Sequence, residues 1–382
     1  MNLYLDNAAT TPLSPSTQEY LISLLDVYGN PSSLHSQGQQ AKELIAKARE
    51  VIAAFIHGKP DEIYFTPSGS ASNTLAIRGY YRKQDCDLFY SPIAHKSILI
   101  CAESYPHARP LKVNSDGLID LKALKEQLTM GNRKIFVIVD YANSEIGTIQ
   151  EVEKLIALVH SYHGIVYLDC TGSISSIPLD VKRLHADMCG FSGHKLGGLK
   201  GCGVLYKKSQ IELEPLICGS QEQGLIGGTE NVLGIASLAK AVENDCCSSI
   251  SSQSRDHVYH SIISNIPDTY LVGSYKNRLP HNLYLCFKGI DGESLMLLLD
   301  MNGIQVSTGS ACNSRSLSPS AVLSAIGMAH EDRYSCIRMT FSGRETRDEL
   351  DYVCKTLEQC VHFLRSLSAS DTPPGSNPPG IG

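Results

Sequence analysis

Short β-rich runs separated by helical stretches make up the middle of this 382-residue chain. The runs are Lys-Ile-Phe-Val-Ile-Val at 134–139, Ile-Val-Tyr-Leu at 165–168 and Gly-Val-Leu-Tyr at 203–206, and the stretch 151–162 has the periodicity of a helix. Alternation of this kind favours an α/β fold with a mostly parallel central sheet. In such sheets ligands bind beyond the carboxyl ends of the strands, so functional residues are expected there.

Two amphipathic helices are predicted before the sheet. The first begins with Ser14 as N-cap and Pro15 at the first helical position, and extends to Tyr28 with Gly29 as the stop. The second covers 37–57, where apolar residues recur at helical spacing.

A Ser-rich stretch at 248–254 marks a boundary between two units. We expect a large domain at 1–250, whose N-terminal segment can pack on the other unit, and a smaller α+β domain at 251–367 with strands near 282–287 and 336–341. Its closing helix is expected from Thr346 to about Leu367, with Thr346 and Glu349 as a capping box. Residues 368–382 are rich in Pro, Gly and Ser and should form a disordered tail.

Charge and cysteine usage exclude several classes of protein. The chain has 33 basic and 39 acidic residues, a net charge of −6, so a nucleic-acid-binding surface is not expected. No apolar run reaches the roughly 20 residues that a membrane helix needs, and the N-terminus lacks the basic start of a signal peptide. The 13 cysteines are scattered without a Cys-x-x-Cys pair, which favours free thiols in the reducing cytoplasm and no metal site.

Two residues at expected strand ends indicate a site for a carbonyl cofactor. Lys195 lies in the turn Ser-Gly-His-Lys at 192–195, which several glycines follow. A desolvated lysine amine forms Schiff bases with carbonyl compounds; the alternative is a surface lysine in a glycine loop. Asp169 follows the run 165–168, where a carboxylate can pair with a pyridinium nitrogen or simply start a turn.

Two further segments are rich in small residues. Thr-Pro-Ser-Gly-Ser-Ala-Ser-Asn at 66–73 opens a helical run, and its backbone N–H groups either bind a phosphate or form an ordinary N-cap. The segment 306–316 carries Cys312 close to Arg315. An accessible thiol beside a basic residue is a candidate nucleophile.

Five motifs in order resemble one enzyme family. They are Tyr-Leu-Asp-Asn-Ala-Ala-Thr-Thr at 4–11, Tyr-Gly-Asn-Pro-Ser-Ser-Leu-His at 28–35, Ser-Gly-His-Lys at 192–195, Gly-Thr-Glu-Asn at 228–231 and Gly-Ser-Ala-Cys at 309–312. From about residue 3 to 366 the chain resembles the NifS/IscS-type cysteine desulfurases, which are pyridoxal 5′-phosphate (PLP) enzymes. The resemblance implies the fold type I of PLP-dependent transferases, with helices on both faces of the sheet.

The resemblance also implies a role for each matching residue. Lys195 would hold PLP as a Schiff base, Asp169 would pair with the ring nitrogen, and His95 would stack on the ring and move protons. Arg338 would bind the substrate carboxylate through its bidentate fork. The remaining implied roles are phosphate binding by Gly69, Ser70, Ser192, His194 and, from a neighbouring subunit, Thr229; substrate binding by Asn30; and sulfur acceptance by Cys312.

Four cofactor positions depart from the pattern of this family. Ser70 replaces a threonine and keeps a hydroxyl, and Ile226 stands where an arginine is usual. Ser144 and Gly172 replace an asparagine and a glutamine that contact the cofactor ring in the family. Glycine cannot donate a side-chain hydrogen bond, so these departures put the rate in doubt more than the type of reaction.

The implied activity is that of a cysteine desulfurase, a sulfurtransferase. It would release L-alanine from L-cysteine and leave a persulfide on Cys312 for iron–sulfur or tRNA-thiolation acceptor proteins, and the enzyme would be a homodimer. Two alternatives stay open. A PLP lyase acting on selenocysteine or cysteine sulfinate would not need Cys312, and a degenerate paralogue would act as a scaffold without catalysis.

Overall fold

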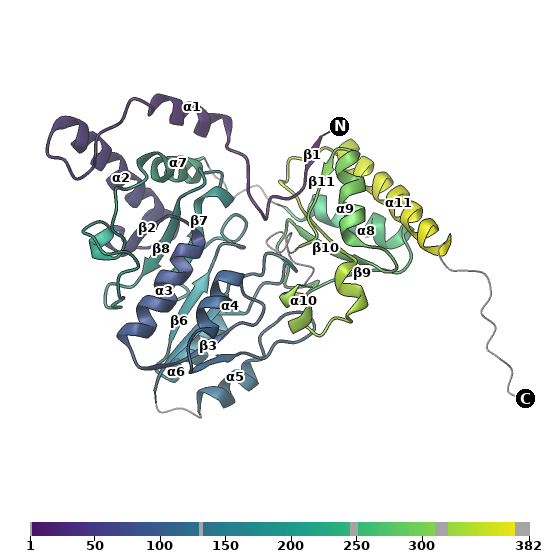
Figure 1. Cartoon of the computed structure of the whole chain (residues 1–382), viewed down its shortest axis with the longest axis horizontal. Helices are drawn as coiled ribbons and strands as arrows, with labels where there is room; N and C mark the ends of the chain where they lie inside the picture. Colours follow the sequence, from purple (N-terminus) through teal and green to yellow (C-terminus); the bar gives the residue numbers. More distant parts are fainter. Residues whose placement is uncertain (1, 130–132, 245–250, 310–319, 371–382) are drawn as a thin grey trace, which may run out of the picture.

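The computed structural model describes residues 2–129, 133–244, 251–309 and 320–370, and the side chains up to residue 367. Cys312 and the predicted tail from residue 371 lie outside the described residues. Two units lie side by side in Figure 1, the larger one at the left and the smaller one at the right.

A seven-stranded sheet forms the centre of the larger unit, with the strand order β2-β8-β7-β6-β5-β3-β4. The pairs from β7 to β4 are all parallel, and β8 runs antiparallel to both of its neighbours. This confirms the predicted α/β fold with a mostly parallel sheet. The strands are β2 (Ile63–Thr66), β3 (Cys86–Tyr90), β4 (Ala108–Pro110), β5 (Lys134–Asp140), β6 (Ile165–Asp169), β7 (Met188–Ser192) and β8 (Gly203–Lys207).

Helices cover both faces of this sheet because alternate side chains of its strands are apolar on each face. One face packs against α2, α5, α6 and α7, and the other against α3 and α4. The helices are α1 (Pro15–Ser23), α2 (Ser36–Phe55), α3 (Gly69–Lys83), α4 (Lys96–Glu103), α5 (Leu121–Leu128), α6 (Val152–Ser161) and α7 (Val232–Glu243), with short 3₁₀ turns η1 (Pro60–Glu62), η2 (Gly193–Lys195) and η3 (Glu222–Gly224).

The smaller unit has its own apolar core around an antiparallel sheet of order β12-β10-β9. The N-terminal strand β1 (Leu3–Tyr4) joins this unit by pairing in parallel with β11 (Ile304–Gln305). The other elements are α8 (Gln253–Asn265), β9 (Thr269–Leu271), β10 (Asn282–Phe287), α9 (Gly292–Met301), α10 (Ala321–Ala325), η5 (Glu331–Tyr334), β12 (Cys336–Thr340) and α11 (Arg347–Ser370).

Two predicted helix ends are wrong. The first helix ends at Ser23 rather than at Tyr28, because the residues that follow form short turns in which Leu24 N–H and Leu25 N–H donate three residues back. Leu25 and Tyr28 are exposed, so the core offers no apolar surface to continue the helix. The last helix reaches Ser370, so residues 368–370 belong to α11 and not to the predicted tail.

Among the described residues, no helix is both long enough and apolar enough to cross a membrane.

The capping box of α11 generates a testable prediction. Glu349 N–H donates to Thr346 Oγ1 (3.3 Å), and Thr346 N–H donates to Glu349 Oε2 (2.7 Å). We expect Thr346→Ala to lower the free energy of unfolding by about 1 kcal/mol, because a helix N–H loses its acceptor. Thr346→Ser keeps the oxygen and should stay within a few tenths of a kcal/mol of wild type in urea unfolding. Equal losses in both variants would contradict this role.

Candidate active site

Asp169 ends the central strand β6 and is 4% exposed. Its carboxylate accepts hydrogen bonds from Thr171 N–H (2.8 Å) and from Asn73 Nδ2 on α3 (2.9 Å). The buried hydroxyl of Tyr167 donates to Asn73 Oδ1 and thereby fixes the orientation of the amide. Two donors therefore fix the position of the Asp169 carboxyl group at the carboxyl edge of the sheet.

Lys195 ends the turn η2, which follows directly on β7. The turn is held from outside, because Thr11 donates to His194 O through both its N–H (3.1 Å) and its hydroxyl (2.9 Å). Gly197 and Gly201 follow with positive φ values of 84° and 85°, which only glycine adopts without strain. The glycines of the predicted motif thus return the chain sharply and leave Lys195 at the edge of the sheet.

A small cavity lies where the two units meet. Lys195, Ser144 and Gly172 line it, as does Thr171 beside Asp169. The rest of its wall comes from Asn7 and Ala8 of the N-terminal segment, from Ser175, and from Leu279 and His281 of the smaller unit. The structure therefore brings Lys195 and two of the departing positions to one cavity.

The start of α3 forms a cradle beside this cavity. A Cβ atom on Gly69 would lie 3.1 Å from Thr171 Oγ1 and 3.3 Å from Ser192 Cβ, so three segments converge on the helix N-terminus. Thr171 Oγ1 is buried and has no hydrogen-bond partner among the described residues. A helix N-terminus with an unsatisfied hydroxyl beside it fits a phosphate group.

His194, a predicted phosphate ligand, follows Ser192 after one residue and contacts Thr10 Oγ1 through Nδ1 (3.0 Å). Burial, with the charges of Lys195 and Lys200, lowers the pKa of His194 to about 4. The imidazole is therefore neutral at physiological pH, and its role toward a phosphate would be that of a hydrogen-bond donor.

His95 caps the N-terminus of α4, and its Nδ1 lies 2.8 Å from Ser97 Oγ. Partial desolvation lowers the pKa of His95; Asp169 opposes this shift, and the charge of Lys195 adds to it. Both charges act on the imidazole because Asp169 and Lys195 lie on the same edge of the sheet. A neutral imidazole at this place can accept a proton.

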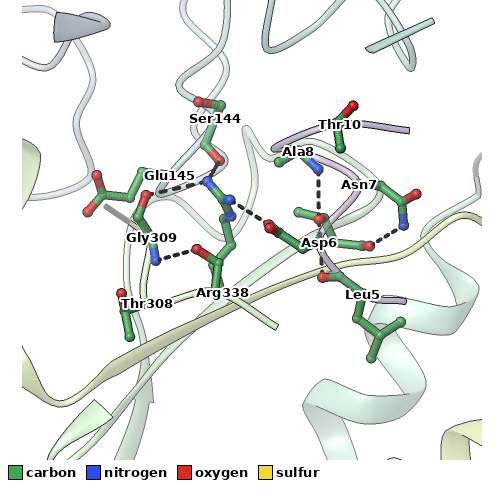
Figure 2. Close-up of polar contacts among 12 residues, drawn as sticks. Leu5, Asp6, Asn7, Ala8, Thr10, Ser144, Glu145, Thr308, Gly309 and Arg338 are labelled. Carbon is green, nitrogen blue, oxygen red and sulfur yellow. Dashed lines mark hydrogen bonds and ion pairs between the residues drawn. The ribbon is translucent and has the colours of Figure 1, made fainter. Parts of the chain in front are cut away.

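Arg338 on β12 is buried, and Figure 2 shows its contacts. Its Nη2 donates to Asp6 Oδ1 (2.7 Å), and its Nη1 donates to Ser144 O (3.1 Å) and Gly309 O (3.5 Å). Arg338 thus reaches from the smaller unit to the loop after β5. An arginine held in this way is a fixed anion-binding group.

The segment 5–11 connects the two halves of the site. At one end Thr340 N–H donates to Leu5 O (2.7 Å), and Ala8 N–H donates to Thr340 Oγ1 (2.9 Å). At the other end Thr11 holds His194 next to Lys195. Residues far apart in the sequence are therefore fixed relative to one another by one short segment that turns at residues 7–9.

The backbone around Gly172 leaves no space for a side chain at this position. A Cβ atom at Gly172 would lie 2.5 Å from Ala142 O and 3.3 Å from Ser144 Cβ. No side chain fits there without a shift of the backbone. The glutamine that the NifS/IscS-type enzymes have at this position would therefore find no room here. Ser144, opposite, contributes its backbone oxygen to Arg338.

Several residues predicted for the site do not line this cavity. Asn30 and Thr229 are exposed, and neither lines the cavity. Asn30 Oδ1 accepts a hydrogen bond from Ser32 N–H (2.9 Å) and forms a local turn. Ile226 is buried in the core beside α3 and α4. Cys312 lies outside the described residues, and Gly309, three residues before it, contacts Arg338.

Sequence reasoning missed four polar residues of the site: Asp6, Asn73, Asp140 and His281. Asp140 lies beside Asp169 in the parallel register of β5 and β6, and burial together with the charge of Asp169 raises its pKa to about 6. An aspartate one strand away from Asp169, also at a strand end, was a signal that could have found it. The other three are brought to the site only by tertiary contacts.

The chain matches the family model for class-V aminotransferases over residues 3–353. The chain belongs to this family. A cysteine desulfurase IscS of Dictyoglomus turgidum is 37% identical over 96% of both chains. Among solved structures, a NifS-like protein of Rickettsia africae has a TM-score of 0.87 at 31% identity, covering 95% of this chain and 100% of that one. SspA in complex with cysteine has a TM-score of 0.79 at 30% identity, covering 90% and 100%.

Class-V aminotransferases are PLP enzymes, and the residues of this chain fit that cofactor. The cavity holds an amine on Lys195, a fixed carboxylate on Asp169 lies at the same sheet edge, and the cradle at Gly69 has an unsatisfied hydroxyl nearby. These groups match the carbonyl, the ring nitrogen and the phosphate of PLP in chemical type.

His281 generates a prediction for pH dependence. Burial, followed by the charges of Arg338 and Lys195, lowers the pKa of His281 to about 4. The unfolded chain, with a histidine pKa near 6.5, binds this proton first, so stability is lost as pH falls from about 6.5 toward 4. His281 should therefore contribute about 2 kcal/mol to the loss of unfolding free energy between pH 7.5 and pH 5.

The measurement is urea unfolding of wild type and His281→Asn at both pH values. The asparagine keeps a polar atom but does not titrate, so its loss of stability should be smaller by that amount. The same pH dependence in both proteins would show that His281 is not buried as a neutral imidazole.

Proposed function

We propose that the protein is a cysteine desulfurase that uses PLP bound to Lys195. L-cysteine and the Cys312 thiol would give L-alanine and a Cys312 persulfide, which balances in atoms and electrons. The observation that carries the proposal is the presence of Lys195 in a cavity at the sheet edge where Asp169 ends β6. The similarity to cysteine desulfurases over 96% of the chain supports the choice of substrate.

The cofactor would be held by residues from four segments of one subunit and by one residue of a second subunit. Lys195 Nζ would form the covalent link, and Asp169 would pair with the ring nitrogen. The neutral His95 would lie against the ring. The phosphate ligands would be Gly69, Ser70, Ser192 and His194, with Thr229 from a second subunit.

PLP, when bound, supplies an electron sink for the charge that develops at Cα of the substrate. Lys195 Nζ would take the Cα proton and later return it. Arg338 would bind the substrate carboxylate, and the neutral His95 would accept a proton from the substrate thiol. Cys312 Sγ would attack the substrate sulfur, so that an S–S bond forms as the C–S bond breaks and Cβ gains a proton.

The departures at Ser144 and Gly172 leave these reacting groups unchanged. Neither position carries the amine, the ring carboxylate, the arginine or the thiol of the proposed reaction. Their side chains would no longer bond the cofactor ring, so we expect an effect on cofactor positioning and rate rather than on the products.

We also propose a homodimer in a reducing compartment such as the cytoplasm. Thr229 is exposed, as are the apolar side chains Ile22, Leu25 and Leu34, which suits a surface that a second subunit covers. All ten described cysteines are free thiols. The persulfide would pass to an acceptor protein that serves iron–sulfur assembly or tRNA thiolation.

The first test of this function is Cys312→Ala. With PLP and a reductant, wild type should release alanine and sulfide from L-cysteine, and the variant should lose alanine formation by at least about 100-fold because the nucleophile is gone. Cys218→Ala is the matched control, since Cys218 is an exposed free thiol away from the cavity. Equal turnover in wild type and Cys312→Ala would indicate a lyase instead.

A second test concerns Lys195. Borohydride reduction of wild type should fix the mass of the cofactor on Lys195, and Lys195→Ala should carry no fixed cofactor because the amine is missing. Lys200→Ala, an exposed lysine in the same glycine-rich turn, should behave like wild type. A wild-type protein that remains colourless with PLP would favour the scaffold alternative over an enzyme.

A further inference from the structure

The guanidinium of Arg338 has one edge that its partners fill incompletely. Nη1 donates to two backbone oxygens, those of Ser144 and Gly309, and Nη2 donates to Asp6 Oδ1. Nε is buried and has no hydrogen-bond partner among the described residues. The edge formed by Nε and Nη2 therefore makes one hydrogen bond where a carboxylate bound through both oxygens would make two.

Asp6 serves as the counter-ion of this buried arginine. Its side chain is 19% exposed, whereas that of Arg338 is 5% exposed. A buried guanidinium without an anion is costly, so some carboxylate has to stay close to Arg338. Asp6 can return to solvent when another carboxylate arrives, because its side chain already lies partly at the surface.

The backbone around Asp6 is held independently of its carboxylate. Thr340 N–H donates to Leu5 O (2.7 Å), Ala8 N–H donates to Thr340 Oγ1 (2.9 Å), and Asn7 Nδ2 donates to Thr340 O (2.7 Å). Figure 2 shows Asp6 pointing to Arg338 from this anchored segment. A rotation of the Asp6 side chain breaks none of these bonds, so an exchange of carboxylates requires no movement of the backbone.

We propose that Asp6 is a displaceable counter-ion that occupies the carboxylate subsite until a ligand carboxylate binds the Nε–Nη2 edge of Arg338. The inference rests on the proposed function, in which Arg338 binds the substrate carboxylate. Asp6 competes with every ligand for this edge and so weakens binding. It also makes the subsite selective, because an uncharged ligand that displaced Asp6 would break this ion pair without replacing it.

The test measures binding of 3-mercaptopropionate to the PLP-loaded protein by titration calorimetry, with 3-mercaptopropionamide as the uncharged counterpart. Asp6→Asn removes the competing charge and keeps the shape of the side chain. It should bind 3-mercaptopropionate roughly threefold to tenfold more tightly than wild type. The substitution should change the affinity for 3-mercaptopropionamide less than it changes the affinity for 3-mercaptopropionate.

Asp300→Asn is the matched control, since it changes the net charge equally from an exposed site on α9 and should bind like wild type. Asp6→Ser repeats the test should Asp6→Asn fold poorly. Unchanged or weaker binding in both Asp6 variants would overturn the inference and make Asp6 a support for the guanidinium. Arg338→Gln tests the proposed function separately from the role of Asp6. If this variant no longer binds 3-mercaptopropionate, Arg338 is the residue that binds the carboxylate. If binding is unchanged, Arg338 does not bind the carboxylate, and the inference about Asp6 is wrong as well.

Discussion

The site depends on the hydrogen bonds that the segment 5–11 makes to both units. The larger unit supplies Lys195 and Asp169, and the smaller one supplies Arg338 and His281 from a separate apolar core. Bonds from Thr340 at one end and to His194 at the other hold these groups at fixed separation. The same segment also supplies Asn7 and Ala8, which form part of the cavity wall.

The residues that could be predicted from the sequence are those whose local context carries the signal. Asp169 follows an apolar strand directly, and Lys195 follows another in a turn with four glycines. Strand ends at the carboxyl edge of a parallel sheet meet in space, so sequence position alone predicted that these two lie close together. The capping box at Thr346 was predictable for the same reason, because its two partners are three residues apart.

The remaining parts of the site depend on contacts that no local pattern shows. Asn73 lies within an ordinary helix, and its role follows only from the packing of α3 against β6. Asp6 lies in the motif 4–11, but its contact with Arg338 joins residues more than 300 positions apart, and His281 reaches the site from the second unit. The end of the first helix was wrong because periodicity continues to Tyr28 while the core that would support a helix ends at Leu24. The shape of the backbone around Gly172 is likewise visible only in three dimensions.

The hydroxyl of Tyr167 links the interior of the sheet to the charge at its edge. It donates to Asn73, which in turn donates to Asp169. Gly190 on β7 pairs with Asp169, and a Cβ atom there would lie 2.0 Å from the Tyr167 hydroxyl. A glycine at this position therefore leaves room for the hydroxyl. Replacing Tyr167 by phenylalanine would remove the closest of these contacts, but a Cβ atom at position 190 would still lie 3.1 Å from Ser72 Cβ and from the aromatic ring. The tyrosine and the glycine therefore constrain each other, because any side chain at position 190 excludes the hydroxyl that orients Asn73.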